Sequence, residues 1–443
     1  MYTAIVCRLN GIRRHGNADR LQLCNLQGYQ VVLGEDSKEG QLGCFCPSDG
    51  KLNPSFVAAN DLAPRFDAEG KRAGGGFFDP PNFRLRSQKF RGERSDGYWF
   101  PIEYLENWAI CLGNKEVVAA VNALKEGDQF SCLGGVELCS KYETQATKQA
   151  HAANKQKGLK KNSKNHLFLE HVETQQFRHQ AHNIPVGSVV YISLKQHGTS
   201  ARYTFMYDQP RLSFWELFTK KVSEKYGLKR NPVLGHRHIV GSRTVQIKDE
   251  KGGWYGSNAF RFKAFSSFKD ALRPGETVYG ELVGFTAPGK PIMAVHDTTK
   301  LKDKEVTKLY GNRMVYSYGC EDGECDFYVY RVTRSCETGH AIELSVSQVK
   351  ARCEELGLKY VHELTGPLLM RTVDDLDWLR GLVESFSDGP DPLGKTHVRE
   401  GVVVRVESPD GRTYFLKYKG FTFSVCEGLL LDTNTYIDEE GSS

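Results

Sequence analysis

The chain has 443 residues, of which 40% are hydrophobic and 26% are charged, and this is the composition of a folded, globular protein. It excludes a largely disordered chain, and no run approaches the roughly 18 apolar residues that a membrane-spanning helix needs. The 59 basic and 54 acidic residues leave a net charge of only +5, which by itself indicates no class of partner. The first ten residues lack the apolar segment of a secretion signal, so we expect a cytoplasmic protein.

The 12 cysteines predict reduced thiols, because disulfide frameworks are typical of short secreted chains. Two close pairs occur, Cys44 with Cys46 and Cys320 with Cys325. Neither pair has the two-residue spacing of a zinc site or a second pair at zinc-finger distance. We therefore expect no structural zinc.

Residues 1–110 are predicted to form short strands separated by glycine-containing turns. Three apolar runs have the length of a strand: residues 29–33, 42–46 and 98–100. Such spacing is typical of a small β-barrel. Residues 114–124 instead have helical spacing, with Val117, Val121 and Leu124 on one face.

Residues 111–165 are predicted to be this helix followed by a connector between two domains. No acidic residue occurs between Glu143 and Glu170, and the same stretch contains six lysines, at positions 148, 155, 157, 160, 161 and 164. A basic segment of this kind is typical either of a patch that binds phosphates or of a solvated linker without a partner. The sequence leaves both interpretations open.

Residues 166–443 form one long segment in which strand-like and helix-like patterns are mixed. Strands are expected near residues 189–192, 277–280 and 402–405, and helices near residues 214–226 and 346–356. The acidic tail at residues 438–443 is typical of a frayed terminus.

The residues around Lys195 are the most informative for chemistry. Lys195 follows an apolar strand, and Gly198 lets the backbone turn tightly before two hydroxyl side chains and Arg202. A lysine that is partly desolvated and close to other cations can lose its proton near neutral pH and act as a nucleophile. The pattern is short, however, and a surface lysine before a turn has the same appearance.

Three further segments supply groups that nucleotidyl transfer needs. Glu281 lies on a strand between two glycines, and Glu400 precedes Gly401 and a β-branched strand. Lys417 and Lys419 alternate with their neighbours, so both point to the same face of a strand. Each segment alone is compatible with an ordinary amphipathic strand. A lysine nucleophile, two carboxylates and two further cations in one chain favour nucleotidyl transfer.

In this combination, residues 166–425 resemble the covalent nucleotidyltransferase superfamily of polynucleotide ligases and capping enzymes, and most closely its RNA ligases. The family's motifs would correspond to these residues: motif I to Lys195 and Gly198, motif Ia to Ser242, Arg243 and Thr244, motif III to Glu281, motif IIIa to Asp326 through Tyr330, motif IV to Glu400, and motif V to Lys417 and Lys419. The sequence Lys-x-His-Gly-Thr in motif I is similar to that of the bacteriophage nick-sealing and kinetoplastid editing RNA ligases.

Three residues depart from the pattern of these relatives. Leu194 stands where many relatives have a glutamate before the lysine, and His197 replaces an aspartate of other branches. Each change removes a carboxylate from the neighbourhood of the predicted nucleophile. Arg331 follows Tyr330 where relatives often have an aspartate, which leaves the aromatic ring but changes its surroundings.

The resemblance implies an ATP-dependent RNA ligase that works in three steps. Lys195 attacks the α-phosphate of ATP to form a lysyl-AMP, the AMP moves to an RNA 5′-phosphate, and a 3′-hydroxyl then displaces it. Mg²⁺, or Mn²⁺, would be held by Glu281 and Glu400, and Tyr330 would stack on the adenine. The implied nucleotide-binding residues are Lys195, Gly198, Arg202, Arg243, Glu281, Tyr330, Glu400, Lys417 and Lys419. The implied catalytic residues are Lys195, Glu281, Glu400, Lys417 and Lys419.

The first domain resembles OB-type tRNA-binding modules and the OB module of Deinococcus-type RNA ligases. The resemblance is carried by residues 15–33 and 83–101. Such barrels bind nucleic-acid backbones through basic and aromatic side chains. The expected nucleic-acid-binding cations are Arg84, Arg86, Lys89, Arg91 and Arg94. A solvated barrel edge would carry cations as well.

We therefore expect an α+β protein with three parts. An N-terminal OB-type β-barrel (residues 1–110) is joined by residues 111–165 to a nucleotidyltransferase domain of antiparallel sheets with flanking helices (residues 166–443). The expected partner is RNA with 3′-hydroxyl and 5′-phosphate ends, such as a nicked duplex in RNA repair. Neither a membrane nor a protein partner is indicated.

Two alternatives stay open at this point. A capping-type guanylyltransferase or a DNA ligase would usually carry a C-terminal OB domain after motif V, and only 24 residues follow Lys419. A catalytically inactive RNA-binding protein could keep the fold without the chemistry. All of the motif lysines and both glutamates are present, which favours an active enzyme.

Overall fold

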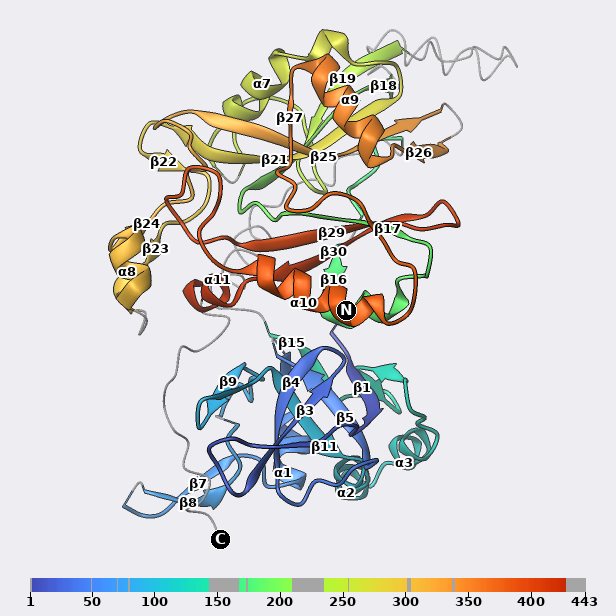
Figure 1. Cartoon of the computed structure of the whole chain (residues 1–443), viewed down its shortest axis with the longest axis vertical. Helices are drawn as coiled ribbons and strands as arrows, with labels where there is room; N and C mark the ends of the chain where they lie inside the picture. The colour runs from blue at the N-terminus through green and yellow to red at the C-terminus, as the bar shows by residue number, and fades with distance from the viewer. Residues whose placement is uncertain are drawn as a thin grey trace, which may run out of the picture. The chain divides into compact units, whose positions relative to one another are not determined.

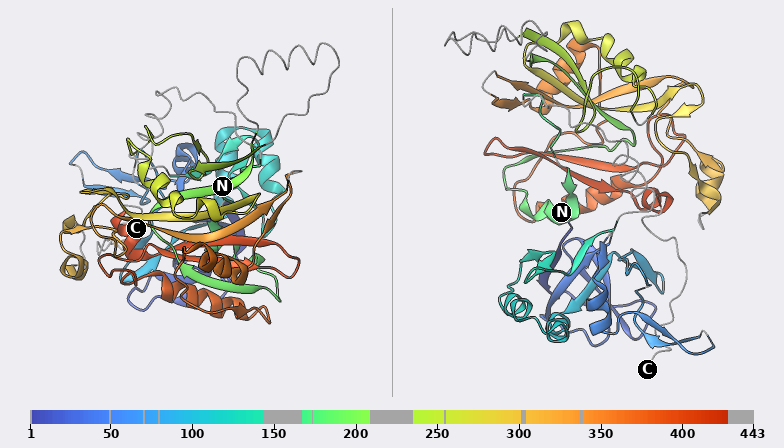
Figure 2. Two further views of the ribbon diagram at one scale, coloured as in Figure 1. Left: turned by 90° about the horizontal axis from the view of Figure 1, so that it is seen from above. Right: turned by 180° about the vertical axis from the view of Figure 1, so that it is seen from behind.

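The computed structural model describes residues 2–48, 50–69, 71–78, 80–142, 167–172, 174–208, 235–253, 255–300, 304–336 and 339–427. The chain divides into two compact units, made mainly of residues 1–159 and 160–423, and each is described by itself (Figures 1 and 2). The predicted basic connector, the helix expected at 214–226 and the acidic tail lie outside the described residues.

The N-terminal unit is built from antiparallel strands. A four-stranded sheet has the order β11 (Gly97–Pro101), β5 (Leu42–Pro47), β1 (Ala4–Arg8) and β12 (Gln129–Phe130). A three-stranded sheet has the order β2 (Arg13–Arg14), β3 (Leu21–Leu26) and β4 (Tyr29–Gly34). Short ladders pair β6 (Gly50–Leu52) with β15 (Cys139–Lys141), β7 (Pro64–Phe66) with β8 (Arg72–Gly75), β9 (Gln88–Phe90) with β10 (Glu93–Ser95), and β13 (Cys132–Leu133) with β14 (Val136–Glu137). The strands β4, β5 and β11 confirm the three predicted runs.

Helices cover one face of the four-stranded sheet. They are α1 (Pro54–Ala59), α2 (Glu103–Leu112) and α3 (Lys115–Asn122). The predicted helical face is confirmed in α3, where Val117 and Val121 are buried. The same core also contains Leu133 and Cys139, so this unit continues well past residue 110.

The other face of the four-stranded sheet packs against the three-stranded sheet. Phe45 and Trp99 on the first sheet share a buried cluster with Val31 on the second. A closed barrel would need the ladder to continue beyond β4. Beyond β4 one backbone bond is made, from the amide of Asp96 to the carbonyl of Gln30 at 2.8 Å, and the amide of Val32 then donates to the side chain of Ser95 at 3.1 Å instead of to a backbone carbonyl. Among the described residues the strands form separate sheets, so the predicted OB-type β-barrel is not confirmed.

The second unit contains two mainly antiparallel sheets (Figure 1). The five-stranded sheet has the order β16 (Gln175–Gln176), β30 (Thr413–Lys419), β29 (Gly401–Glu407), β17 (Val189–Leu194) and β28 (Leu368–Leu369). The eight-stranded sheet has the order β20 (Gln246–Ile247), β19 (Gly235–Gly241), β18 (Thr199–Asp208), β21 (Glu276–Ala287), β25 (Cys325–Ser335) and β26 (Ala341–Glu343), with β22 (Lys290–Pro291) beside β21 and β27 (Lys359–Tyr360) beside β25. The predicted strands near 189–192, 277–280 and 402–405 are confirmed.

Helices cover the outer face of each large sheet (Figures 1 and 2). The eight-stranded sheet packs against α7 (Ala259–Ser266) and α9 (Val346–Leu356), and the five-stranded sheet packs against α5 (Phe177–Gln180) and α10 (Asp375–Ser387). The helix α9 has the predicted bounds, and a capping box between Ser345 and Gln348 fixes its start. Because apolar side chains alternate toward these helices, the polar residues between them point to the side where the two sheets meet.

The remaining described elements are short. They are η1 (Ala181–Asn183), η2 (Lys269–Ala271), η3 (Thr298–Lys300), β23 (His296–Asp297), β24 (Arg313–Met314), α8 (Lys304–Tyr310) and α11 (Phe421–Cys426). No helix in the described part of the chain is long and apolar enough to span a lipid bilayer.

Candidate active site

Lys195 lies at the end of β17, in the loop that leads into β18. Its backbone amide donates to the carbonyl of Gly401 at 2.9 Å, which fixes the loop to the start of β29. Its side-chain Nζ lies 2.6 Å from Oε1 of Glu400. A side chain at Gly198 would clash with the carbonyl oxygen of Leu282, so the loop can approach β21 only with glycine at this position.

Glu400 is the centre of a small group of charges. Its side chain is only 3% exposed, and Nζ of Lys419 lies 3.9 Å from the same oxygen that binds Lys195. Nδ1 of His197 lies 3.9 Å from the other carboxylate oxygen. The residues predicted to act together are therefore neighbours: they are Lys195, Glu400 and Lys419, which come from three places in the sequence.

Lys417 shares a face of β30 with Lys419, as the alternation predicted. Leu416 and Tyr418, which alternate with these lysines, are buried in the core on the opposite side of the sheet. Lys417 pairs in register with Val403 of β29. Both lysines are thus directed to the side where the two sheets meet.

Glu281 brings a carboxylate from the other sheet. It pairs in register with Ser200 of β18, whose hydroxyl donates to Glu281 Oε2 at 3.1 Å. Burial raises the pKa of Glu281 to about 7, an effect that Lys195 opposes and the nearby Glu400 reinforces. A Cβ atom at Gly198 would lie 2.9 Å from Cγ of Glu281, so this side chain is beside the loop that carries Lys195.

Tyr330, the predicted stacking residue, occupies a β-bulge in β25. The register pairs Gly280 with Val329 and Tyr279 with Arg331, so Tyr330 is an additional residue opposite no partner. Its ring lies 4.8 Å from the ring of His171, measured between centroids. The bulge turns an aromatic side chain out of the regular alternation and toward the segment that precedes β17.

His171 is a residue that the sequence analysis missed. Its ring also lies 5.5 Å from Phe415 of the five-stranded sheet, so it contacts side chains of both sheets. Burial, together with Arg331, Arg243 and Arg202, lowers the pKa of His171 to about 3, and the imidazole is neutral at physiological pH. A single histidine that follows the apolar residues 167–169 and belongs to no motif gives no sequence signal for this position.

Arg202 was predicted to bind the nucleotide, but the structure places it differently. Its guanidinium donates to the carbonyl oxygens of Ser242, Phe168 and Leu169 at 2.6, 3.1 and 2.7 Å. It is 2% exposed, and it also lies over the ring of Phe168. Arg202 therefore holds the segment before β17 in place, because its Nε and Nη1 donors are taken by the backbone.

Arg243, the predicted motif Ia arginine, is exposed in the loop between β19 and β20. It is close enough to His171 and Tyr330 to lower the pKa of each ring, although burial raises that of Tyr330 overall. The guanidinium of Arg243 thus adds positive charge near Tyr330, the predicted stacking residue.

The two glutamates fit a divalent cation. Oε2 of Glu400 is buried and accepts no hydrogen bond, which leaves a carboxylate oxygen available as a ligand. Among the described residues, no group of three or more histidine, cysteine or acidic side chains is placed to hold a metal by itself. Mg²⁺ is commonly held by one or two carboxylates with substrate phosphates and water completing its shell. Glu281 and Glu400 match that kind of site.

Two of the predicted cations of the N-terminal unit contact side chains of the same unit. The guanidinium of Arg84 lies 4.2 Å from the ring centroid of Tyr142, and Arg94 Nε donates to Asp96. Arg91 occupies the turn between β9 and β10 with a φ of +47°. The remaining two predicted cations are Arg86, which is half-buried, and Lys89, whose side chain lies outside the described residues.

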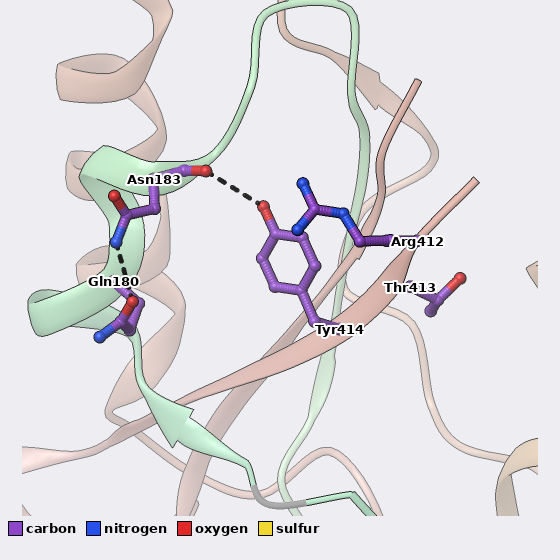
Figure 3. A pocket seen from close by; sticks show the side chains of 5 residues that line it. All are labelled: Gln180, Asn183, Arg412, Thr413 and Tyr414. Atoms are coloured by element: carbon purple, nitrogen blue, oxygen red, sulfur yellow. Dashed lines mark hydrogen bonds between the residues drawn. The ribbon is translucent and has the colours of Figure 1, made fainter. Parts of the chain in front are cut away.

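A surface pocket of about 410 Å³ lies away from these residues (Figure 3). It is lined by Gln180, Asn183, Arg412, Thr413 and Tyr414. The Tyr414 hydroxyl donates to the carbonyl of Asn183 at 3.5 Å, and Arg412 is paired with Asp410 at 2.6 Å. The pocket is at the beginning of β30, whereas Lys417 and Lys419 are at its end, and it contains none of the predicted site residues.

Comparison with protein families gives the class to which this fold and group of residues belong. The family RNA ligase matches residues 188–419, which is just over half of the chain and includes Lys195, Glu281, Glu400 and Lys419. The chain therefore belongs to the RNA ligase family and is an enzyme that ligates RNA.

Solved structures support the same fold. A Naegleria gruberi RNA ligase variant with AMP and Mn is 16% identical, with a TM-score of 0.54, and the match covers 95% of this chain and 97% of that one. A second variant, with ATP and Mn, is 15% identical with a TM-score of 0.54 and the same coverage. An apo variant is 16% identical with a TM-score of 0.55 and also covers 95% and 97%. The comparison with curated proteins gave no match.

Proposed function

We propose that this RNA ligase uses ATP and a divalent cation, and that Lys195 carries AMP from one substrate to the other. The observation that carries the proposal is the 2.6 Å distance between Lys195 Nζ and Glu400 Oε1, with Lys419 3.9 Å from the same oxygen and Glu281 beside them. The Naegleria gruberi ligase structures that contain ATP or AMP with Mn support the choice of nucleotide and cation.

In the proposed first step, the amine of Lys195 attacks the α-phosphorus of ATP. A P–N bond forms, the bond to the pyrophosphate oxygen breaks, and the amine gives up a proton to solvent. Because only the neutral amine is nucleophilic, Lys195 must first leave the carboxylate of Glu400. Lys417 and Lys419 then stabilise the negative charge that develops on the transferring phosphate.

The next two steps join the RNA ends. An oxygen of the RNA 5′-phosphate attacks the phosphorus of the lysyl-AMP, the P–N bond breaks, and Lys195 regains a proton. The 3′-hydroxyl then attacks the RNA 5′-phosphorus, which forms the phosphodiester and releases AMP. A divalent cation at Glu281 and Glu400 would add positive charge against these phosphates. Tyr330 would hold the adenine by stacking, and Arg243 would assist binding of the phosphate-bearing end.

The N-terminal unit is proposed to be an open variant of an OB-type module that binds the RNA backbone. Its two small sheets pack face to face around Phe45 and Trp99, which is compatible with an interrupted barrel. The β9–β10 hairpin carries Lys89, Arg91 and Arg94 close together in sequence, and cations bind RNA phosphates with a strong dependence on salt. The proposed substrate is a nicked duplex with 3′-hydroxyl and 5′-phosphate ends.

The test has two stages and uses the full-length protein. Incubation with ATP and Mg²⁺ should add the mass of one AMP to the protein, whereas GTP should add nothing. The protein should then seal a nick in an RNA duplex with 3′-hydroxyl and 5′-phosphate ends. A protein that gains no nucleotide mass with ATP, or that gains GMP from GTP, would contradict the proposal.

A further inference from the structure

The loop that carries Lys195 has a second anchor, from a residue outside every motif. The backbone amide of His197 donates to the hydroxyl oxygen of Tyr318 at 2.5 Å. Tyr318 lies between β24 and β25 and is only 2% exposed. The first anchor is the bond from the Lys195 amide to the Gly401 carbonyl, so the two bonds hold the loop from two different segments.

The backbone of Tyr318 is strained. Its φ is +53°, which lies in the left-handed region that residues with a side chain rarely adopt. The turn is held by close backbone packing, because a Cβ atom at Gly394 would overlap the backbone nitrogen of Gly319. Strain of this kind persists only where the surroundings impose it, and it is concentrated at functional sites.

The same tyrosine contacts the segment that leads to Glu400. Its ring lies 4.4 Å from that of His397, which is fully buried three residues before Glu400. The hydroxyl of Tyr318 therefore contacts the loop that carries Lys195. The ring of Tyr318 contacts the segment that precedes Glu400. An ordinary core tyrosine would be satisfied by donating to any carbonyl, whereas this hydroxyl accepts a bond from a loop amide.

We infer that Tyr318 is a positioning residue for AMP transfer: it sets the backbone of the Lys195 loop relative to Glu400. This inference rests on the proposed role of Lys195 as the nucleophile. A shift of the loop would change the distance from Nζ to both Glu400 and the α-phosphate. Reaction rates are sensitive to displacements of about 1 Å in such groups.

The test replaces the hydroxyl alone in the full-length protein, by Tyr318→Phe. The maximal rate of lysyl-AMP formation in a single turnover should fall roughly tenfold, as expected for the loss of one buried hydrogen bond. The ATP concentration for half-maximal rate should change by less than about twofold, because the hydroxyl does not contact ATP. Sealing of a nick that is already adenylylated should stay near the wild-type rate, because that step does not use Lys195 as a nucleophile.

Tyr316→Phe is the matched control. Tyr316 is equally buried, and its hydroxyl shares a 2.9 Å hydrogen bond with His296. Its ring lies 4.7 Å from that of His197, and the substitution keeps this ring contact while it removes the hydroxyl. This variant should form lysyl-AMP at the wild-type rate.

Three results would overturn the inference. The first is a Tyr318→Phe variant that forms lysyl-AMP as fast as the wild type. The second is an equal loss in Tyr316→Phe, and the third is a parallel loss of lysyl-AMP formation and of sealing, which would indicate a general effect on folding. A wild-type protein that forms no adduct with ATP would instead contradict the proposed function itself.

Discussion

The two units of this protein treat their predicted functional residues in opposite ways. In the second unit, Lys195, Glu281 and Glu400 are far apart in the sequence, yet strand pairing makes them neighbours. In the N-terminal unit, five predicted cations lie within eleven residues, yet Arg84 and Arg94 are engaged by side chains of their own unit. The difference teaches that register between paired strands, rather than nearness in the sequence, decides which residues can act together.

The largest effect is expected at the centre of the second unit. Lys195→Ala should abolish the covalent nucleotide adduct, because no other amine is bonded to Glu400 at 2.6 Å among the described residues. Mass spectrometry after incubation with ATP and Mg²⁺ measures the adduct. Lys263→Ala is the control, since Lys263 is an exposed lysine of the same unit that pairs with Glu324. An adduct of undiminished yield in Lys195→Ala would remove the nucleophile from the proposed site.

The next effect tests whether the neighbours of Lys195 act with it. Lys419→Ala should slow lysyl-AMP formation by about 10²–10³-fold, the usual loss when one group that stabilises charge in the transition state is removed. Single-turnover kinetics give the rate. Lys359→Ala should have no such effect, because Lys359 is held by Asp326 on the edge of the larger sheet. Equal rates of lysyl-AMP formation in the two variants would show that Lys419 does not contribute to this step through its position near Glu400.

Glu281 offers a test through stability. The carboxyl has a pKa of about 7 in the folded protein, against an ordinary value of 4.5. Between pH 4.5 and 7 the unfolded chain has lost this proton while the folded protein still holds it, so stability falls as pH rises through this window. Relative to Glu281→Gln, the wild type should lose on the order of 2 kcal/mol of unfolding free energy across it. Urea unfolding at several pH values measures the difference, and a gap that does not change with pH would contradict the raised pKa of Glu281.

The smallest effect is expected in the N-terminal unit. Replacing Arg86 and Arg91 together by alanine should weaken RNA binding at every sequence and lower the slope of affinity against salt by about 1–2. Adduct formation with ATP should be unchanged. Arg94→Ala should instead lower the stability of the unit, because it removes the partner of Asp96. If the double variant binds RNA with the wild-type salt dependence, the hairpin is not part of the RNA-binding surface.

The sequence predicted three strands and the helix α9 of the second unit, and it predicted that Lys417 and Lys419 share a face, for a physical reason. The strands are long and alternate regularly, so the shared face of Lys417 and Lys419 follows from their spacing alone. The closing of the N-terminal barrel was not predictable in this way. Past β4 the amide of Asp96 bonds the carbonyl of Gln30, whereas the amide of Val32 donates to the side chain of Ser95, and no periodic pattern in the sequence contains that difference.

Other residues of the candidate site were missed for a different reason. His171 and Tyr318 belong to irregular segments, where neither period nor motif marks a residue. Arg202 was expected to bind the nucleotide on the family resemblance, and local sequence gave no sign that its Nε and Nη1 would donate to three carbonyls of the chain itself. Contacts of this kind arise from the path of the whole chain, so they could not be derived from local sequence.

The bulge at Tyr330 has a consequence for how β25 tolerates the deletion of a residue. Phe327, Val329 and Val332 all lie in the core beneath the eight-stranded sheet, and the spacing of three between the last two is the mark of one inserted residue. Removing Tyr330 would restore strict alternation and leave every neighbouring pair in register. The sheet is therefore complete without this aromatic ring. A strand that can lose a residue without losing its partners is free to acquire or discard an extra side chain while its fold stays the same.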